Sequence, residues 1–246
     1  MSYTIESIAE CIGARRVGEC EATIDWLLTD SRSLSFPEET LFFALTTKRN
    51  SGARYIPDLY DRGVRNFVVT EEDFEKFKNG ELGKLSTLNF LIVANPLKAL
   101  QKLAEIHREE FKIPIIGITG SNGKTIVKEW LHQLLSPDRR IVRSPRSYNS
   151  QIGVPLSVWQ LNEEAELGIF EAGISEMGEM NALKRMIKPT IGILTNIGGA
   201  HQENFFSLQE KCMEKLILFK DCDVVIYNGD NEPVSYTHLT LPTKRI

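Results

Sequence analysis

The chain has 246 residues, of which 42% are hydrophobic, and a formal net charge of -4 at pH 7. This length is enough for one large domain or two modest domains, each with an apolar core. The mild acidity argues against a nucleic acid as the main partner, because binding to a phosphate backbone needs a basic face.

Membrane insertion, secretion and zinc binding are not expected either. No apolar run approaches the roughly 20 residues of a membrane span, and the first residues lack the basic and then apolar layout of a signal peptide. The four cysteines form no CxxC pair, which favours reduced thiols over a zinc or redox site. We therefore expect a cytoplasmic protein without membrane insertion.

Short apolar runs alternate with amphipathic stretches in the first 112 residues, as is typical of an α/β domain. Asn95 and Pro96 predict a helix start, with a cap followed by a proline in the first turn. This helix should end near residue 112, because Pro114 disfavours helical geometry in the residue before it. We place a domain boundary there, after residues 1–112. The expected strands of this domain are 41–45, 66–70 and 89–93.

From residue 113 onward, alternating strand and helix patterns predict a second α/β domain with a mostly parallel sheet. The expected strands are 113–118, 167–172, 191–196 and 223–228. The expected helices are 124–135, 179–187 and 208–219. The pattern stops at residue 233, and the threonine-rich segment 234–246 does not continue it. We expect that the second domain is truncated and that residues 234–246 are a non-native tail.

A glycine-rich loop, GITGSNGKT (117–125), stands between the first strand and the first helix of this domain. Its glycines permit tight turns that aim backbone N–H groups at phosphate oxygens, and the helix start adds positive potential. Lys124 is suited to the β- and γ-phosphates and the Thr125 hydroxyl to Mg²⁺. The alternative is a turn with a chance Lys-Thr, since position 118 is Ile118 rather than the glycine of the general pattern. The residues expected to bind ATP are Gly120, Ser121, Asn122, Gly123, Lys124 and Thr125.

Three further polar residues follow predicted strands, at the edge where open α/β sheets bind ligands. Glu171 ends one strand, and His201 follows another in a glycine-rich turn. Lys215 lies on the apolar stripe of the helix 208–219, where a lysine must snorkel, pair or do chemistry. Each residue has a structural alternative, as a cap, a core histidine or a snorkelling lysine. Their joint placement after a phosphate loop favours a catalytic site.

The motifs of the chain together resemble those of the Mur ligase family, which builds the peptide stem of peptidoglycan. The resemblance implies a uridine-nucleotide-binding N-terminal domain followed by a P-loop-type ATP-binding domain over residues 113–233. It is closest to the branch that joins D-alanyl-D-alanine to UDP-N-acetylmuramoyl-tripeptide. The blocks that carry it are 29–45, 117–125, 147–158, 171–180 and 196–215.

The resemblance also implies a role for each matching residue. Lys124 and its loop would hold the phosphates of ATP, and Thr125 would bind a first Mg²⁺. Glu171 and His201 would bind a second Mg²⁺, supported by Lys215 as a carbamate. The catalytic residues would thus be Lys124, His201 and Lys215. The substrate-binding residues would be Ser31 and Arg32, for the uridine nucleotide, and Asn149, near the peptide.

The implied reaction is ATP-dependent amide ligation through an acyl phosphate, by a monomer. We expect the chain to be inactive alone, because family members carry a third domain after these two. Whether an alanine racemase also follows, as in some members, stays open. The alternatives are another Mur-type ligase, a ligase like folylpolyglutamate synthase, and a nucleotide-binding fragment without catalysis.

Overall fold

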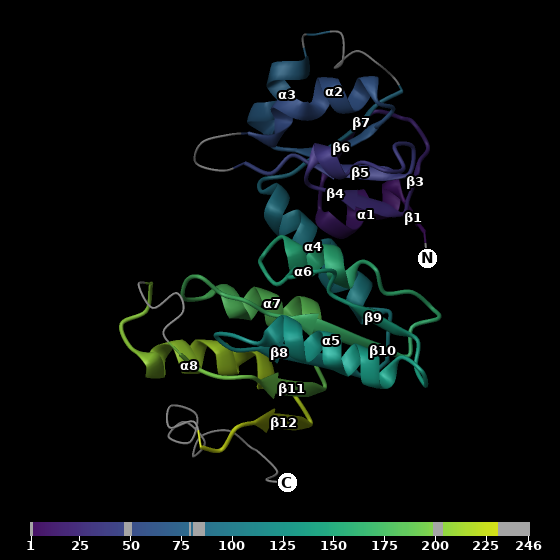
Figure 1. The fold of residues 1–246 in the computed structure, drawn as a ribbon. Helices are drawn as coiled ribbons and strands as arrows, with labels where there is room; N and C mark the ends of the chain where they lie inside the picture. The colour runs from purple at the N-terminus through teal and green to yellow at the C-terminus, as the bar shows by residue number, and fades with distance from the viewer. Residues whose placement is uncertain (1, 47–50, 79, 81–86, 199–203, 231–246) are drawn as a thin grey trace. The chain divides into compact units, whose positions relative to one another are not determined.

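The computed structural model describes residues 2–46, 51–78, 80, 87–198 and 204–230 (Figure 1). They form two compact units, Met1–Leu103 and Ala104–Ile246. The division falls within helix α4 (Pro96–Glu109), whereas the sequence places a boundary at residue 112. The reason is that Ala104 and Phe111 pack into the core of the second unit. Within the described ranges, no helix is long and apolar enough to cross a lipid bilayer.

The first unit contains a five-stranded sheet with the order β2-β7-β6-β5-β4. The four strands that pair in parallel are β4 (Trp26–Leu28), β5 (Thr40–Phe43), β6 (Asn66–Val69) and β7 (Asn89–Ile92). At one edge, β2 (Arg15–Val17) runs antiparallel to β7. A separate antiparallel pair joins β1 (Tyr3–Thr4) and β3 (Thr23–Ile24). The strands expected near residues 41, 66 and 89 are therefore present, and their Phe42, Phe67 and Phe90 lie in one core.

Short helices complete the first unit. Its α-helices, apart from the start of α4, are α1 (Ile5–Ile12), α2 (Ile56–Asp61) and α3 (Glu71–Lys78). Its 3-10 turns are η1 (Ser31–Ser33) and η2 (Gly52–Tyr55). The turn η1 follows β4, so Ser31 and Arg32 lie beyond the carboxyl end of a parallel strand. That is the edge at which open α/β sheets bind ligands.

The second unit has a five-stranded sheet in which every pair is parallel, with the order β12-β11-β8-β10-β9. Its strands are β8 (Ile115–Thr119), β9 (Ile141–Arg143), β10 (Leu167–Glu171), β11 (Ile191–Leu194) and β12 (Val224–Tyr227). Its helices are α5 (Lys124–Leu135), α6 (Gly153–Val158), α7 (Glu179–Ile187), α8 (Leu208–Leu216) and the 3-10 turn η5 (Ile217–Phe219). The α/β class and the mostly parallel sheet are confirmed. Residues 234–246 lie outside the described residues.

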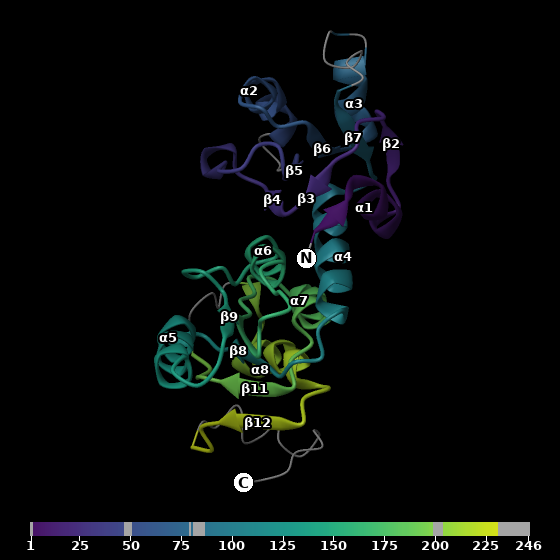
Figure 2. The same ribbon diagram turned by 90° about the vertical axis from the view of Figure 1, so that its right-hand side faces the viewer.

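Helices cover both faces of this sheet (Figure 2). Alternate side chains of β8 divide between the faces: Ile115 packs with α6, α7 and α8, whereas Ile116 and Ile118 pack with α5. Strands that are buried on both faces have continuously apolar sequences, which is why β8 and β10 could be predicted. The strand β9 and the helix α6 were not predicted, because three and six residues are too few to show a period.

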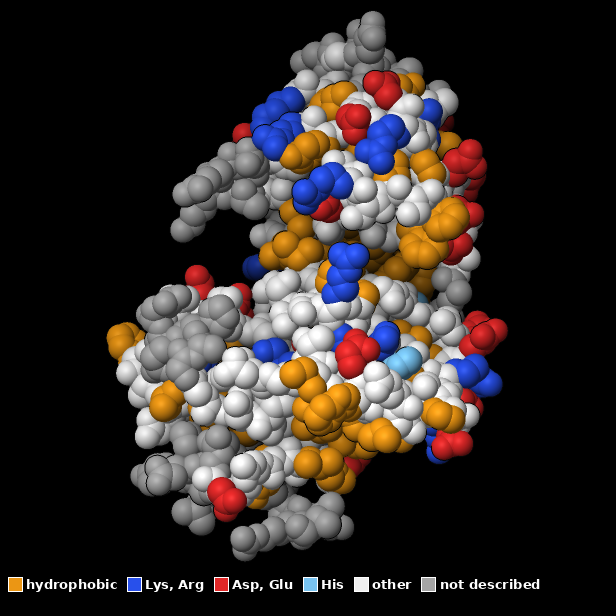
Figure 3. Space-filling model, viewed as in Figure 1, with side chains coloured by type: hydrophobic (Ala, Val, Ile, Leu, Met, Phe, Trp, Pro, Cys, Tyr) orange, Lys and Arg blue, Asp and Glu red, His pale blue; other side chains and the backbone are white. Residues whose placement is uncertain are grey.

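Helix α5 has an unexpected orientation. Ile126, Trp130 and Leu134 are 57%, 64% and 73% exposed, and Figure 3 shows apolar side chains gathered over this helix. The side turned toward the sheet instead carries Val127, Leu131 and Leu135. Lys128 shares that inward side and is fully buried.

We expect His107 to make the second unit sensitive to acid. Its Nε2 donates to the carbonyl of Leu161 at 3.0 Å, and burial lowers its pKa from 6.5 to about 4. Between these two pH values the unfolded chain binds a proton that the folded unit does not. The free energy of unfolding should therefore fall as the pH drops from 6.5 to 4, by about 3 kcal/mol.

The measurement is urea unfolding at a series of pH values for the wild-type chain and for His107→Gln. The two curves of stability against pH should diverge within this window and run parallel below it. Curves of equal slope throughout the window would show that His107 does not set the acid dependence.

Candidate active site

The phosphate loop connects β8 to α5 as the sequence predicted. Gly120 and Gly123 have φ angles of +143° and +82°, in the left-handed region that favours glycine. A Cβ on Gly120 would lie 2.0 Å from Thr195 Oγ1, so no side chain fits there. Gly123 provides no side-chain cap for α5, which leaves the amides of the first turn available to an anion.

The end of β11 holds this loop in place. The amides of Ser121 and Asn122 donate to the backbone and side-chain oxygens of Asn196, both at 2.9 Å. Thr195 Oγ1 donates to the carbonyl of Asn122 at 2.6 Å, and the amide of Gly198 donates to Ser121 Oγ at 2.9 Å. Two loop amides are therefore engaged within the protein. The amides of the first turn of α5 are available to phosphate, because Gly123 supplies no side-chain cap.

A small cavity of about 110 Å³ lies beside the loop. Three lysines reach it, namely Lys124, Lys211 and Lys215, and Lys124 Nζ donates to the carbonyl of Gly120 at 2.9 Å. The volume corresponds to a few water molecules, so it suits a phosphoryl group rather than a whole nucleotide. Its basic lining favours an anion. The full lining is Gly120, Ser121, Lys124, Asn149, Ser150, Gly173, Ile174, Ser175, Lys211 and Lys215.

Lys215 is buried on α8, as its place on the apolar stripe predicted. The helix starts where expected, since Ser207 Oγ accepts from the amide of Glu210 at 3.0 Å. The Glu210 carboxylate accepts from the backbone amide of Phe206 at 2.8 Å, one residue before the cap. Burial lowers the pKa of Lys215 to about 7, with the charges of Lys124 and Lys211 adding to the effect. A large fraction of this amine is therefore neutral near pH 7.

Glu171 and Thr125 form the second part of the site. The carboxylate of Glu171 is fully buried, and its Oε2 accepts from Thr125 Oγ1 at 3.0 Å. Asn149 Nδ2 lies 3.5 Å from the same oxygen, and Ser147 Oγ lies 3.3 Å from Thr125 Oγ1. The loop after β9 thus contacts the first turn of α5 and the end of β10.

These oxygens fit Mg²⁺. The described residues contain no cluster of three or more acidic, histidine or cysteine side chains that could hold a metal alone. Mg²⁺ does not need one, since it commonly uses one or two carboxylates together with substrate phosphates and water. Two ligands at right angles, each 2.0–2.1 Å from the ion, lie about 2.9 Å apart. The 3.0 Å between Thr125 Oγ1 and Glu171 Oε2 matches that spacing.

The predicted substrate residue Asn149 also lines the cavity. Its carbonyl accepts from the amide of Gly173 at 2.7 Å. A Cβ on Gly173 would lie 2.9 Å from Asn149 Oδ1, so glycine allows the two segments to approach. The position of Asn149 therefore depends on the turn that follows β10.

Two other predicted residues lie in the first unit. Ser31 and Arg32 belong to the first unit, where the guanidinium of Arg32 pairs with Asp30 at 2.6 Å and stays 87% exposed. The carbonyl of Ser31 accepts from Arg62 at 2.8 Å. His201 lies outside the described residues, so its predicted metal-binding and catalytic roles stay predictions.

Two lysines and one asparagine at the site were not predicted from the sequence. Lys128 pairs with Glu171 at 3.0 Å, and Lys211 donates to the carbonyl of Gly198 at 2.7 Å. The sequence spacing could have indicated both lysines, because Lys128 is four residues after Lys124 and Lys211 is four residues before Lys215. Residues four apart share a helix face. Asn196 had no such signal, since its role depends on a contact between distant segments.

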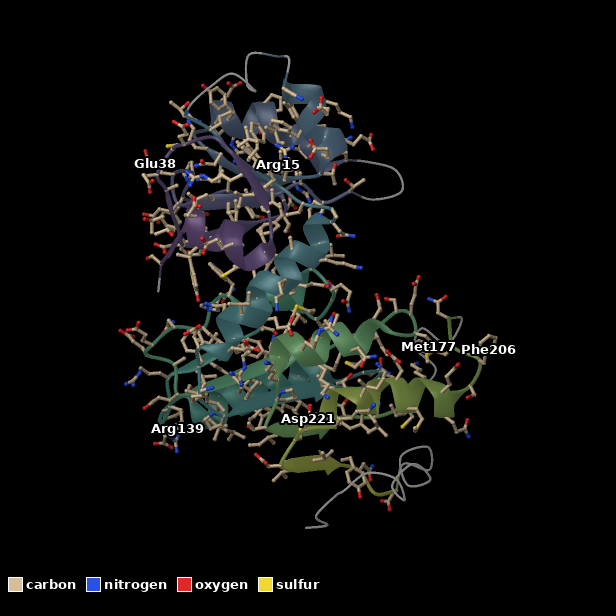
Figure 4. The ribbon with its side chains drawn as sticks, turned by 180° about the vertical axis from the view of Figure 1, so that it is seen from behind. Arg15, Glu38, Arg139, Met177, Phe206 and Asp221 are labelled. Carbon is tan, nitrogen blue, oxygen red and sulfur yellow. The ribbon has the colours of Figure 1, made fainter. Side chains whose placement is uncertain are left out.

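Glu214 joins α8 to α7 beside the site. Its buried carboxylate accepts from the amides of Gly178 and Met180 at 2.9 and 3.1 Å, where α7 has no side-chain cap of its own. Figure 4 shows Met177, next to this contact, at the same end of the second unit as Phe206, whereas Arg139 lies at the opposite end.

Glu214→Ala should lower the free energy of unfolding by about 1–3 kcal/mol, because it leaves the two amides without an acceptor. Glu214→Gln, which keeps one acceptor oxygen, should lose less. The exposed Glu163→Ala is the matched control and should change stability by no more than about 0.5 kcal/mol. Urea denaturation measures all three variants, and equal stability of Glu214→Ala and the control would contradict the capping role.

Comparisons with known proteins agree with this architecture. A family model described as the Mur ligase middle domain matches residues 118–244. UDP-N-acetylmuramoyl-tripeptide--D-alanyl-D-alanine ligases are similar in sequence. The one from Borreliella burgdorferi is 34% identical, over 88% of this chain and 47% of its own length. The one from Treponema pallidum is 41% identical, over 89% and 48%.

Solved structures show the same fold. MurF from Acinetobacter baumannii has a TM-score of 0.79 at 21% identity, over 97% of this chain and 52% of its own. MurF ligase from Thermotoga maritima, in complex with ADP, has a TM-score of 0.71 at 24% identity, over 85% and 47%. The chain spans about half the length of the curated relatives it matches. On the family match and the motifs at its phosphate loop, the chain belongs to the Mur ligase family.

Proposed function

We propose that this chain is the substrate- and ATP-binding part of a ligase that joins D-alanyl-D-alanine to UDP-N-acetylmuramoyl-tripeptide. The observation that carries the proposal is a small basic cavity that the phosphate loop lines together with Lys124 and the buried amine of Lys215. The hydroxyl–carboxylate pair of Thr125 and Glu171 adjoins the cavity through Asn149, which lines it and lies 3.5 Å from Glu171 Oε2. Sequence relatives that carry this ligase name support it.

The proposed chemistry is activation of a carboxylate. An oxygen of the tripeptide carboxylate attacks the γ-phosphorus of ATP, the bond from that phosphorus to the β–γ bridging oxygen breaks, and ADP leaves. The amine of D-alanyl-D-alanine then attacks the acyl carbon, loses a proton, and displaces phosphate. Lys124 and the first-turn amides of α5 neutralise charge on the transferred group, the main catalytic contribution in phosphoryl transfer.

Thr125 and Glu171 would hold Mg²⁺ through one oxygen each. Their 3.0 Å spacing fits a single ion that both residues would hold, whereas the family resemblance assigns them to two ions. Mg²⁺ supplies charge neutralisation at the phosphate oxygens when bound. A second ion would need His201 as a ligand, and that role rests on the family resemblance alone.

Lys215 is proposed to react with CO₂. Its neutral amine forms an N–C bond and releases one proton, which gives a carbamate with a negative charge. The lowered pKa supports this step, because an ordinary lysine is almost fully protonated near neutral pH. The carbamate would add an anionic oxygen to a cavity lined by Lys124 and Lys211.

The first unit is proposed to bind the uridine nucleotide, with Ser31 and Arg32 at the carboxyl edge of its sheet. Because the reaction consumes ATP, we place it in the cytoplasm, and we propose that the protein acts as a monomer. The net charge of -4 fits partners other than nucleic acid.

Ligand binding tests the proposal. Mg·ATP and UDP-N-acetylmuramoyl-tripeptide should each raise the midpoint of thermal unfolding of the chain, in a concentration-dependent way. Tetrahydrofolate with glutamate, the substrates of a folylpolyglutamate synthase, should leave it unchanged. No response to either proposed ligand at millimolar concentration would count against the function.

A further inference from the structure

Lys128 lies one helical turn after the phosphate-loop lysine and has no exposed surface. Its Nζ donates to the carbonyl of Ser144 at 2.8 Å and also to the carbonyl of Arg146. Both carbonyls belong to the loop after β9, so this loop holds the ammonium in place. The group lies inside the second unit, on the inward side of α5.

The same ammonium lies 3.0 Å from Glu171 Oε1. Its hydrogen bonds are directed at the two carbonyl oxygens, so Oε1 receives the positive charge without an aligned hydrogen bond. Glu129 Oε1 also lies 3.2 Å from the ammonium, and the other oxygen of that carboxylate, Oε2, pairs with Arg143 at 3.0 Å. Lys128 is thus held among oxygens and cannot leave Glu171 without breaking several contacts.

The two oxygens of Glu171 therefore have different surroundings. Oε1 faces Lys128, whereas Oε2 faces Thr125 and Asn149 at the cavity side. A cation that approached both oxygens at once would be repelled by the fixed ammonium. Only Oε2 remains suitable for a metal, so Glu171 can act as a one-oxygen ligand.

This difference matters for the choice of metal. Mg²⁺ is satisfied by single oxygens in an octahedral shell, whereas Ca²⁺ takes six to eight oxygens and readily binds both oxygens of one carboxylate. We propose that Lys128 is a positioning residue that restricts Glu171 to one-oxygen coordination and thereby favours Mg²⁺ over Ca²⁺. The inference rests on the proposed function, because it takes Glu171 as a metal ligand.

The test measures binding rather than turnover. The affinity of the chain for a non-hydrolysable ATP analogue, adenylyl imidodiphosphate, is measured by calorimetry with saturating Mg²⁺ and again with saturating Ca²⁺. In Lys128→Met, the ratio of the Mg²⁺ affinity to the Ca²⁺ affinity should fall at least about tenfold, as is usual when the partner of a metal ligand is removed. Lys128→Gln, which keeps a donor for the carbonyls but no charge, should show the same fall.

Lys128→Gln decides the outcome if Lys128→Met does not fold. A second check uses Glu171→Gln, in which replacement of Lys128 should leave the ratio unchanged, because the carboxylate it acts on is gone. Folded Lys128 variants with the wild-type ratio would overturn the inference while leaving the proposed function intact. A wild-type chain that binds neither nucleotide complex would contradict the proposed function and the inference with it.

Discussion

Replacing Lys215 with alanine is expected to lower the rate of amide formation about 100- to 1,000-fold in a protein that carries this chain. The loss follows from removal of the buried amine that we propose to carry a carbamate. Nucleotide binding should persist, because the loop around Lys124 and its contacts with Asn196 do not involve Lys215. The measurement is formation of UDP-N-acetylmuramoyl-pentapeptide by mass spectrometry, together with the affinity for Mg·ATP.

Adding a short carboxylic acid distinguishes two roles of Lys215, as the carrier of a carbamate or as a simple positively charged contact. Formate or acetate should partly restore the activity of Lys215→Ala, since either anion can enter the small basic cavity in place of the carbamate. The exposed Lys220→Ala is the matched control and should retain activity with or without the acid. Full activity of Lys215→Ala in the absence of added acid would end the carbamate proposal.

Replacing Lys124 with methionine should have the second large effect. Methionine keeps the apolar stem but removes the ammonium, so the charge-assisted contacts to phosphate are lost. Affinity for Mg·ATP should drop about 10- to 100-fold, and turnover in a protein that carries this chain about 100- to 1,000-fold.

Binding of UDP-N-acetylmuramoyl-tripeptide should survive in Lys124→Met, because we assign the uridine nucleotide of that ligand to the first unit. Lys112→Met, at an exposed position, controls for the loss of one positive charge. Calorimetry measures the affinity of both variants for Mg·ATP and for UDP-N-acetylmuramoyl-tripeptide. An unchanged affinity of Lys124→Met for Mg·ATP would contradict the assignment of the phosphate loop as the ATP site.

Much of the architecture follows from local sequence patterns. The strand at Leu167–Glu171 and the helix at Glu179–Ile187 were predicted with nearly the observed bounds, because buried parallel strands are continuously apolar and helices show a clear period. The glycines of the phosphate loop and the burial of Lys215 were predicted for the same reason. Each depends on the residue itself and its near neighbours.

What the sequence did not reveal depends on contacts between distant segments. Asn196 holds the phosphate loop 74 residues earlier, and no local pattern marks it. Lys128 was passed over because a lysine in a helix is usually solvated, whereas α5 exposes Trp130 and Leu134 and buries the lysine. The reason is the carboxylate of Glu171 and the two carbonyls that meet Lys128 inside the unit.

We propose that the site activates a carboxylate by transfer of phosphate from ATP. UDP-N-acetylmuramoyl-tripeptide labelled with ¹⁸O in its terminal carboxylate tests it most directly. A protein that carries this chain is incubated with the labelled substrate, ATP, Mg²⁺ and D-alanyl-D-alanine, and the released phosphate is analysed by mass spectrometry. We predict one ¹⁸O atom in the phosphate for each amide bond formed. Amide formation with unlabelled phosphate would contradict an acyl phosphate and the mechanism built on it.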